Sequence, residues 1–263
     1  MPTVNIDGYN VEVEKDATIL DAIKKAGIWL PTLCYHPALA ATGSCRICTV
    51  ELDHGDRKQL VTACNYPVRQ DIIVYVSSER AQKARRGIME LLLARSPESK
   101  ELKTLAEQMG VKETPYPKVT ECQRNCILCG LCVQVCEEVI GRSAIGFAGR
   151  GPDRTIAAPF RQPSEDCIAC GACAVVCPVG TIKVIMHEDS REVEISPFKS
   201  RVKLFACKNC GQPLAGNPVI EQAASRVDID NDEFRELVQL CPKCRRLKTA
   251  ADLKTAGFPV KVK

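Results

Sequence analysis

The sequence from Cys126 to Cys136 reads CILCGLCVQVC, and the sequence from Cys167 to Cys177 reads CIACGACAVVC. Both stretches follow the pattern C-x2-C-x2-C-x3-C, and Pro178 comes after the second. In this spacing a short loop wraps three thiolates around one 4Fe-4S cube, and a helix then carries a fourth thiolate away from it. Two copies of the pattern therefore predict a pair of 4Fe-4S sites.

The fourth cysteine of each copy is expected to serve the other cube, because this exchange is the rule in two-cluster ferredoxins. Gly130 and Gly171 follow the second cysteine of each run, where a missing Cβ lets backbone N–H groups turn toward sulfide. The predicted ligand sets are Cys126, Cys129, Cys132 and Cys177 for the first cube, and Cys136, Cys167, Cys170 and Cys173 for the second.

The chain of 263 residues contains 17 cysteines, which must be explained before its other features. A secreted disulfide framework predicts an even count, a signal peptide and a short chain, and none of these is found. Paired C-x2-C spacing instead indicates metal binding in a reducing cytosol, so a cytoplasmic protein is expected.

Charge and hydropathy exclude two other classes of partner. The formal net charge is only +4, with basic and acidic residues interleaved, which argues against nucleic acid. No run approaches the roughly 18 apolar residues of a membrane span, so no direct membrane insertion is expected.

Residues 1–78 form the first predicted domain. Strands at 4–6 and 11–13 surround the turn pair Asp7-Gly8, a helix follows at about 18–26 with Gly27 as its stop, and a strand is expected at 72–76. Two strands, a helix, a cysteine-rich loop and a strand follow one another in a β-grasp ferredoxin. The cysteines of this domain are spaced C-x10-C-x2-C-x15-C and are Cys34, Cys45, Cys48 and Cys64.

Three segments around these cysteines make a resemblance specific: LCYHP at 33–37, GSCRIC at 43–48 and TAC at 62–64. They resemble the 2Fe-2S domain at the start of the large iron–sulfur subunit of complex I. Related domains occur in NAD-linked hydrogenases, formate dehydrogenases and electron-bifurcating NADH-dependent complexes. The resemblance implies that the four thiolates hold one 2Fe-2S cluster.

Residues 79–118 are predicted to be a helical linker. Apolar residues recur at helical spacing over 79–94, and Ser96-Pro97 offers the start of a second helix that ends at Gly110. In the complex I subunit this region usually carries a further 4Fe-4S cluster bound by one His and three Cys. Residues 95–120 contain neither residue type, so that cluster is expected to be absent. Shortened subunits of this kind resemble those of electron-bifurcating complexes.

The dicluster domain is expected over 119–200 and a small C-terminal lobe over 201–263. Helices are predicted at 133–140 and 174–176, then strands at 181–186, 193–195 and 202–205. Two further C-x2-C pairs resemble a zinc ribbon, in which four thiolates close tetrahedrally on one ion. Zinc and a further iron–sulfur cluster both suit such a set, which comprises Cys207, Cys210, Cys241 and Cys244. Asn231 is expected to cap a short helix between the pairs, in which Phe234, Leu237 and Val238 pack inward.

Several other residues are expected to have no role in binding a cofactor or in catalysis. Cys122 is the odd cysteine and is expected to be a free, partly buried thiol. The segment GFAGRG at 146–151 lacks the order of a dinucleotide-binding loop and is expected to be a connection between the cluster halves. No catalytic residue is predicted, and no histidine is expected to be a ligand.

The sequence thus predicts an α+β protein with a β-grasp 2Fe-2S domain, a bacterial-type dicluster ferredoxin domain and a zinc-ribbon-like lobe. The resemblance implies an electron-transfer subunit of a soluble multisubunit NAD(P)H-linked oxidoreductase, of an electron-bifurcating type. Its expected partners are a flavoprotein subunit that binds NAD(H) and a second redox subunit, with ferredoxin as a further candidate. The alternative is a free-standing polyferredoxin that diffuses between partners.

Overall fold

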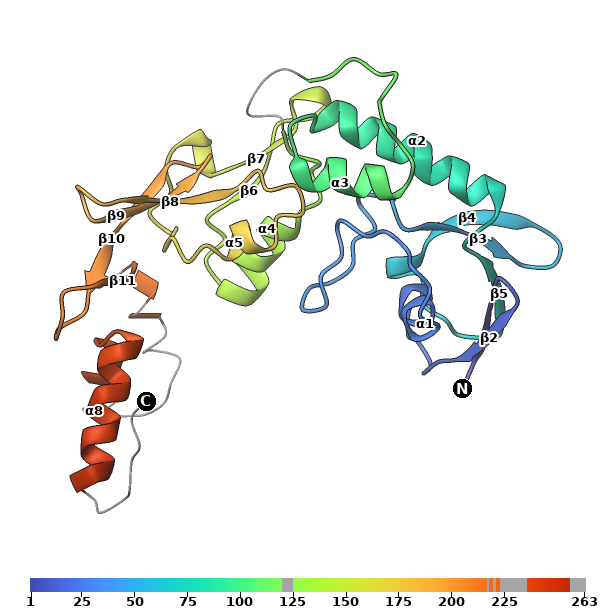
Figure 1. Cartoon of the computed structure of the whole chain (residues 1–263). Helices are drawn as coiled ribbons and strands as arrows, with labels where there is room; N and C mark the ends of the chain where they lie inside the picture. Colours follow the sequence, from blue (N-terminus) through green and yellow to red (C-terminus); the bar gives the residue numbers. More distant parts are fainter. Residues whose placement is uncertain (120–124, 217, 220, 223–235, 256–263) are drawn as a thin grey trace. The chain divides into compact units, whose positions relative to one another are not determined.

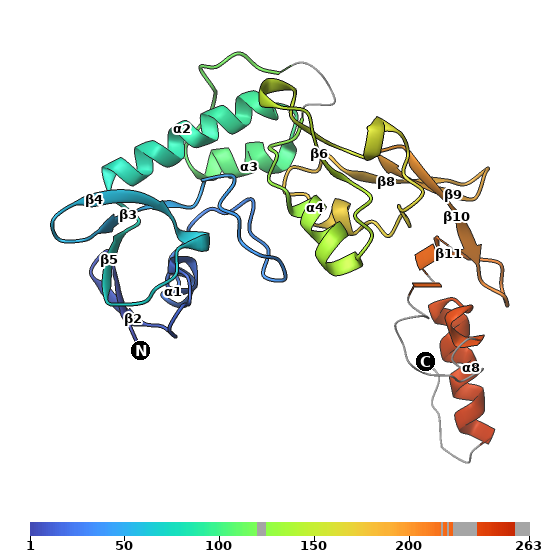
Figure 2. The same ribbon diagram turned by 180° about the vertical axis from the view of Figure 1, so that it is seen from behind.

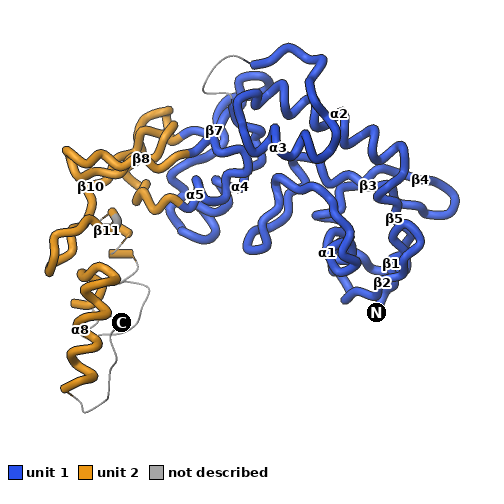
Figure 3. The backbone as a smooth tube through the Cα atoms, in the orientation of Figure 1, with its two compact units in different colours: residues 1–157, 172–182 blue, residues 158–171, 183–263 orange. Residues whose placement is uncertain are grey.

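The computed structural model describes residues 1–119, 125–216, 218–219, 221–222 and 236–255 (Figure 1). The expectations for Cys122, Asn231 and Phe234 lie outside these residues. The described chain forms two compact units, residues 1–157 with 172–182, and residues 158–171 with 183–263 (Figure 3). The four-part division expected from the sequence stays a prediction.

The first unit begins with a five-stranded sheet in the order β2-β1-β5-β3-β4. The strands are β1 (Thr3–Ile6), β2 (Tyr9–Glu12), β3 (Thr49–Asp53), β4 (Lys58–Thr62) and β5 (Ile72–Tyr75). β1 pairs with β2 in antiparallel and with β5 in parallel orientation, whereas β3 pairs antiparallel with both β4 and β5. The sheet matches the β-grasp expectation, and it adds the hairpin of β3 and β4 between the cysteines.

Local chemistry explains the first turn and the first helix. Asp7 and Gly8 have φ values of 48° and 97°, as a two-residue hairpin turn between β1 and β2 requires. The helix α1 (Ile19–Lys25) begins with a capping box, in which the Thr18 hydroxyl and the Asp21 carboxylate accept each other's backbone N–H. It ends before Gly27, whose φ is +70°. Both sequence predictions are confirmed.

Two long helices follow the sheet and lie side by side (Figures 1 and 2). The helix α2 (Glu79–Arg95) packs against β3, and α3 (Lys100–Gln108) packs against α2. The sequence suggested that the second helix starts at Ser96, and this prediction is wrong. The N–H of Ser96 donates to the Leu92 carbonyl and ends α2. The hydroxyl of Ser99 accepts from Leu102 N and caps α3 instead.

The cysteine loops of the dicluster region carry short helical turns. The helix α4 (Leu131–Gln134) continues as the π-helical turn η3 (Val135–Ile140), and α5 (Ala172–Val175) packs against both. The expected helix at 133–140 therefore begins two residues earlier and changes its winding. A small hairpin of β6 (Gly146–Ala148) and β7 (Thr155–Ala157) occupies the segment expected to be a connecting loop. The 3₁₀ turn η4 (Gly151–Asp153) lies between the two strands in the chain, and the turn η5 (Pro159–Arg161) follows β7.

The second unit contains a four-stranded antiparallel sheet in the order β11-β10-β9-β8. Its strands are β8 (Lys183–His187), β9 (Glu192–Ser196), β10 (Ser200–Ala206) and β11 (Pro213–Gly216), and the last helix is α8 (Pro242–Thr255). The three strands expected after the second cysteine run are confirmed. Among the described residues, no helix is both long enough and apolar enough to cross a membrane.

Candidate iron–sulfur and metal sites

The four cysteines predicted to hold a 2Fe-2S cluster are buried between two apolar cores of the first unit. Cys48 precedes β3 and Cys64 lies in the 3₁₀ turn η1 (Ala63–Asn65) after β4, and both belong to the core of the β-grasp sheet. Cys34 and Cys45 flank the long loop and belong to a second core, which also contains residues of α2 and α3. The site therefore has one side in the sheet and one side facing the rest of the unit.

Hydrogen bonds among these thiols show that their sulfur atoms converge. The backbone N–H of Cys45 donates to the Cys34 sulfur over 3.3 Å. Side-chain hydrogen bonds from Cys45 and Cys64 lower the pKa of Cys34 to about 2, and the bond from Cys64 lowers the pKa of Cys48 to about 7. The pKa of Cys64 is raised in return, first by its bond with Cys34. Four buried thiols that cannot all ionise beside one another fit a cationic centre that binds thiolates.

The four cysteines predicted to hold the first 4Fe-4S cluster, Cys126, Cys129, Cys132 and Cys177, lie within the first unit. Leu128 and Gly130 adopt left-handed φ values of 55° and 84°, which fold the loop around its cysteines. The N–H of Leu128 donates to the Cys126 sulfur over 3.3 Å. Burial raises the pKa of Cys129 to about 12, so holding it as a thiolate requires positive charge nearby, which an iron cluster supplies.

The second core joins this ligand set to the 2Fe-2S ligands. It contains Cys34, Cys45 and Cys129, with Cys177 packed against it, and aliphatic side chains from α2 and α3 fill the space around them. The Gln134 amide donates to the Ala40 carbonyl across the two loops over 3.1 Å. Negative charge at Cys34 also adds to the rise in the pKa of Cys129. The two ligand sets are therefore neighbours, and we call this cluster of residues the shared core.

The second 4Fe-4S set is divided between the two units. Cys136 and Cys173 belong to the first unit, whereas Cys167 and Cys170 belong to the second. The second loop repeats the backbone of the first, because Ala169 and Gly171 have φ values of 52° and 75° at the positions equivalent to Leu128 and Gly130. The repeated conformation agrees with the repeated sequence, and this ligand set stays a prediction.

The four C-terminal cysteines lie in the second unit and come together. Cys207 and Cys210 flank the turn that joins β10 to β11, and Cys241 and Cys244 lie at the start of α8. All four sulfur atoms lie within 4.8 Å of one another. Three of the side chains are buried and Cys210 is exposed. No disulfide joins any of the sixteen cysteines that the structure describes.

Two arginines of α2 donate to backbone carbonyls, one in a cysteine loop and one at the sheet, and neither contact was predicted from the sequence. The guanidinium of Arg95 donates to the Cys126 carbonyl over 2.8 Å. Burial raises the pKa of Cys126, and the positive charge of Arg95 acts in the opposite direction. Ten residues earlier, Arg85 donates to the carbonyls of Thr49 and Val76 over 2.8 Å each. The sequence gives no local signal for the contacts with Cys126 and Thr49, which lie 31 and 36 residues away from Arg95 and Arg85.

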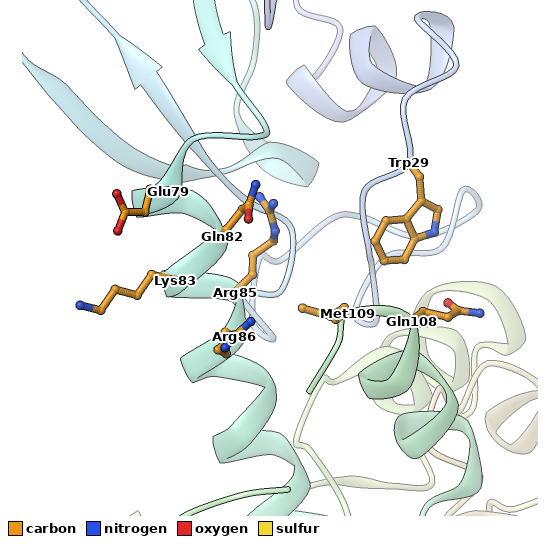
Figure 4. Close-up of a pocket in the computed structure, with 8 residues that line it drawn as sticks. All are labelled: Trp29, Glu79, Gln82, Lys83, Arg85, Arg86, Gln108 and Met109. Carbon is orange, nitrogen blue, oxygen red and sulfur yellow. The ribbon is translucent and has the colours of Figure 1, made fainter. Parts of the chain in front are cut away.

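A pocket of about 610 Å³ opens beside Arg85, between the start of α2 and the end of α3 (Figure 4). Trp29 faces the α2 side chains across this pocket, with Met109 between them. The lining carries the cations Lys83, Arg85 and Arg86 against the single carboxylate Glu79, so the pocket is electropositive. Arg85 is already engaged with two backbone carbonyls and belongs to the packing of α2 on the sheet.

Comparison with protein families identifies two domains. Residues 1–79 match the 2Fe-2S iron-sulfur cluster binding domain, and residues 125–181 match the 4Fe-4S dicluster domain. Both matches fall on the cysteine loops described above.

Three curated relatives match about 70% of this chain. The NADPH-Fe(3+) oxidoreductase subunit alpha of Geobacter sulfurreducens is 35% identical over 204 residues, covering 69% of this chain and 24% of the relative. The NADP-reducing hydrogenase subunit HndD of Solidesulfovibrio fructosivorans is 33% identical, covering 73% and 37%. The mitochondrial NADH-ubiquinone oxidoreductase 78 kDa subunit of Candida albicans is 29% identical, covering 68% and 28%. The chain thus spans about a quarter to a third of the length of these relatives.

A solved structure shares the fold. A chain of the NAD+-reducing [NiFe]-hydrogenase in the H2-reduced state superimposes with a TM-score of 0.52 and 23% identity, covering 80% of this chain and 88% of that one. Together with the two domain matches, these likenesses identify the chain as an iron–sulfur protein with a 2Fe-2S domain and a 4Fe-4S dicluster domain, similar to the N-terminal region of the complex I large iron–sulfur subunit and its relatives in NAD(P)-linked oxidoreductases and hydrogenases.

Proposed function

We propose that this chain is the electron-transfer subunit of a multisubunit NAD(P)H-linked oxidoreductase of the electron-bifurcating type. It passes single electrons between a flavin on one partner and a redox centre on another. The likeness to subunits of NADPH-, NADH- and NADP-linked enzymes supports the link to nicotinamide cofactors. Cys34, Cys45, Cys48 and Cys64 hold the 2Fe-2S cluster, and the two predicted sets of the dicluster domain hold the cubes.

The observation that carries this proposal is the shared core. Iron–sulfur clusters supply one-electron transfer when they are bound. Cys34 and Cys45 lie on the side of the 2Fe-2S site that faces Cys129, and no ligand residue for another cluster occurs between Arg95 and Thr120. The chain therefore needs no relay between its 2Fe-2S site and its first 4Fe-4S site.

The surrounding residues have two further tasks in this role. Buried aliphatic side chains such as Met89, Leu102 and Leu131 exclude water from the space between the two ligand sets. Backbone N–H groups of Cys45 and Leu128 donate to ligand sulfurs, and such bonds help to set the reduction potential of a site.

The proposal is tested by purifying the chain under anaerobic conditions from its native source through an affinity tag. We expect a flavoprotein chain to co-purify in fixed ratio, and NAD(P)H to reduce the iron–sulfur centres of this complex. The electron paramagnetic resonance (EPR) signal of the reduced centres measures that reduction. A Cys34→Ala variant, prepared in the same way, should retain the flavoprotein and lose the 2Fe-2S signal.

Recovery of a lone, cluster-loaded chain that no NAD(P)H-oxidising flavoprotein reduces would contradict the subunit proposal. It would support a free-standing carrier. Bifurcation has its own readout: the complex should reduce a low-potential ferredoxin with NAD(P)H only when a second, high-potential acceptor is present.

A further inference from the structure

We propose that Cys207, Cys210, Cys241 and Cys244 bind a single Zn²⁺ ion and hold no iron–sulfur cluster. The inference goes beyond electron transfer and does not depend on it. The sequence leaves both possibilities open, because four thiolates suit zinc and iron–sulfur centres alike. The positions of the sulfur atoms distinguish a single zinc ion from an iron–sulfur cluster.

The distances between the sulfurs fit one ion. With a Zn–S bond of about 2.3 Å, ligands at tetrahedral corners stand about 3.8 Å apart. The Cys210 and Cys241 sulfurs are 3.7 Å apart, and all four sulfurs lie within 4.8 Å of one another. In a 4Fe-4S cube each thiolate binds a different iron atom, so the sulfurs stand farther apart than they do around one ion.

The same structure provides an internal comparison. Of the residues it describes, only these four form a group of three or more metal-binding side chains whose ligand atoms converge closely enough for one ion. The first 4Fe-4S set, with Cys126 and Cys129, is not among such groups. The chain thus contains two kinds of four-cysteine arrangement, and the C-terminal one is the tighter.

Hydrogen bonds identify the sulfurs as acceptors, as metal-bound thiolates are. The N–H of Cys241 donates to the Cys207 sulfur over 3.2 Å, and the N–H of Cys244 donates to the Cys241 sulfur over 3.4 Å. The side-chain amide of Asn209 donates to the Cys244 sulfur over 3.4 Å. Both C-x2-C segments thus supply hydrogen-bond donors to the sulfurs: Asn209 from the first, and the backbone of Cys241 and Cys244 from the second.

The backbone around the first pair is a tight knuckle. The N–H of Gly211 donates to the Cys207 carbonyl over 2.8 Å, and Gly211 has a φ of +71°, a conformation that favours glycine. Among the residues that the structure describes, the buried cysteines are accompanied in their cluster only by the partly buried Leu214 and Leu240. A bound ion would therefore join the β10–β11 turn to the start of α8.

Metal and acid-labile sulfide analysis of the full chain, purified anaerobically, tests the proposal. We expect about one zinc and about ten iron atoms per chain. X-ray absorption at the zinc edge should show sulfur neighbours at about 2.3 Å and no iron in the second shell. This measurement needs no variant, so it is unaffected by any failure of a variant to fold.

Two variants separate the sites. Cys207→Ala/Cys241→Ala should lose the zinc and keep the iron, the sulfide and the EPR signals of the clusters. The matched control, Cys129→Ala, should lose about four iron atoms and keep the zinc. A wild-type chain with about fourteen iron atoms and no zinc, or with one sulfide-free iron in this site, would overturn the proposal. Either outcome is independent of whether the chain transfers electrons to a partner.

Discussion

The shared core and the C-terminal lobe position their cysteines in different ways. In the shared core, aliphatic residues from α2, α3 and the cysteine loops surround the ligands, and several of these residues are fully buried. In the C-terminal lobe, the four sulfurs lie within 4.8 Å of one another, and of the described residues only two leucines pack against them. Packing can therefore hold the loops of the shared core in place, whereas we propose that the loops of the C-terminal lobe depend on a bound zinc ion.

Only 5% of the residues are aromatic, so aliphatic packing and bound metal are the two means by which the chain can hold its cysteine loops in place. Where electrons are to be exchanged, the loops are fixed to a common core, because electron transfer depends on a constant separation of the centres. Where an ion only closes a turn onto a helix, four thiolates are sufficient. The difference leads to the following predictions.

Removal of the C-terminal ion should have the largest effect. The Cys207→Ala/Cys241→Ala variant should lose hydrogen-exchange protection throughout 207–216 and 241–255, since metal binding and folding are coupled in such small sites. Protection in α2 and α3 should stay at the wild-type level. Equal loss of protection in both regions would show that the lobe is not an independent metal-held element.

Leu102→Ala should destabilise the shared core by about 2–5 kcal/mol, because Leu102 is fully buried and the substitution leaves a cavity. Anaerobic urea denaturation, followed by the visible absorption of the clusters, measures this loss. Leu247→Ala in α8 is the matched control, since Leu247 is 50% exposed, and it should change stability by less than about 0.5 kcal/mol. Similar losses for the two variants would contradict the distinction between the regions.

Arg95→Met should act on the first 4Fe-4S site in particular. The variant loses a charged hydrogen bond to the Cys126 carbonyl, which should cost about 1.5–3 kcal/mol of stability. It also removes positive charge near the site, so the reduction potential of the first cube should fall in an EPR-monitored titration. Arg86→Met, an exposed position on the same helix, should leave that potential unchanged.

Ser99→Ala should have the smallest effect of the four. Loss of the cap of α3 should lower stability by about 1 kcal/mol. A Pro97→Ala variant, outside the helix, is the control and should retain the cap. If Pro97→Ala were the more damaging of the two, the helix would start where the sequence alone suggested.

Much of the fold could be predicted because its signals are local. The Asp7-Gly8 turn, the helix stop at Gly27 and the C-x2-C spacings each depend on residues within a few positions of one another. β3 was missed although its sequence, TVELD, alternates polar and apolar residues, because it lies between the cysteines of the expected loop; its first four residues are all buried in the structure. Ser96 was misassigned because it satisfies the pattern of a cap but is used to close α2.

The arrangement of the sites could not be predicted in the same way. Nothing in the spacing of Cys34 and Cys129 indicates that they share one core, because the contact depends on how α2 and α3 pack. In the structure, Cys34, Cys45 and Cys129 nevertheless belong to one buried cluster. The hydrogen bond of Arg95 could not be predicted either, since its partner Cys126 lies 31 residues away.

The central claim is that the 2Fe-2S site and the first 4Fe-4S site are direct neighbours. Low-temperature EPR of the fully reduced chain tests it. We predict that the 2Fe-2S signal is broadened and relaxes rapidly through magnetic interaction with the reduced cube, and that it becomes narrow and slowly relaxing in Cys129→Ala. A narrow, slowly relaxing 2Fe-2S signal, identical in the wild type and in Cys129→Ala with the cube present in the former, would contradict the claim.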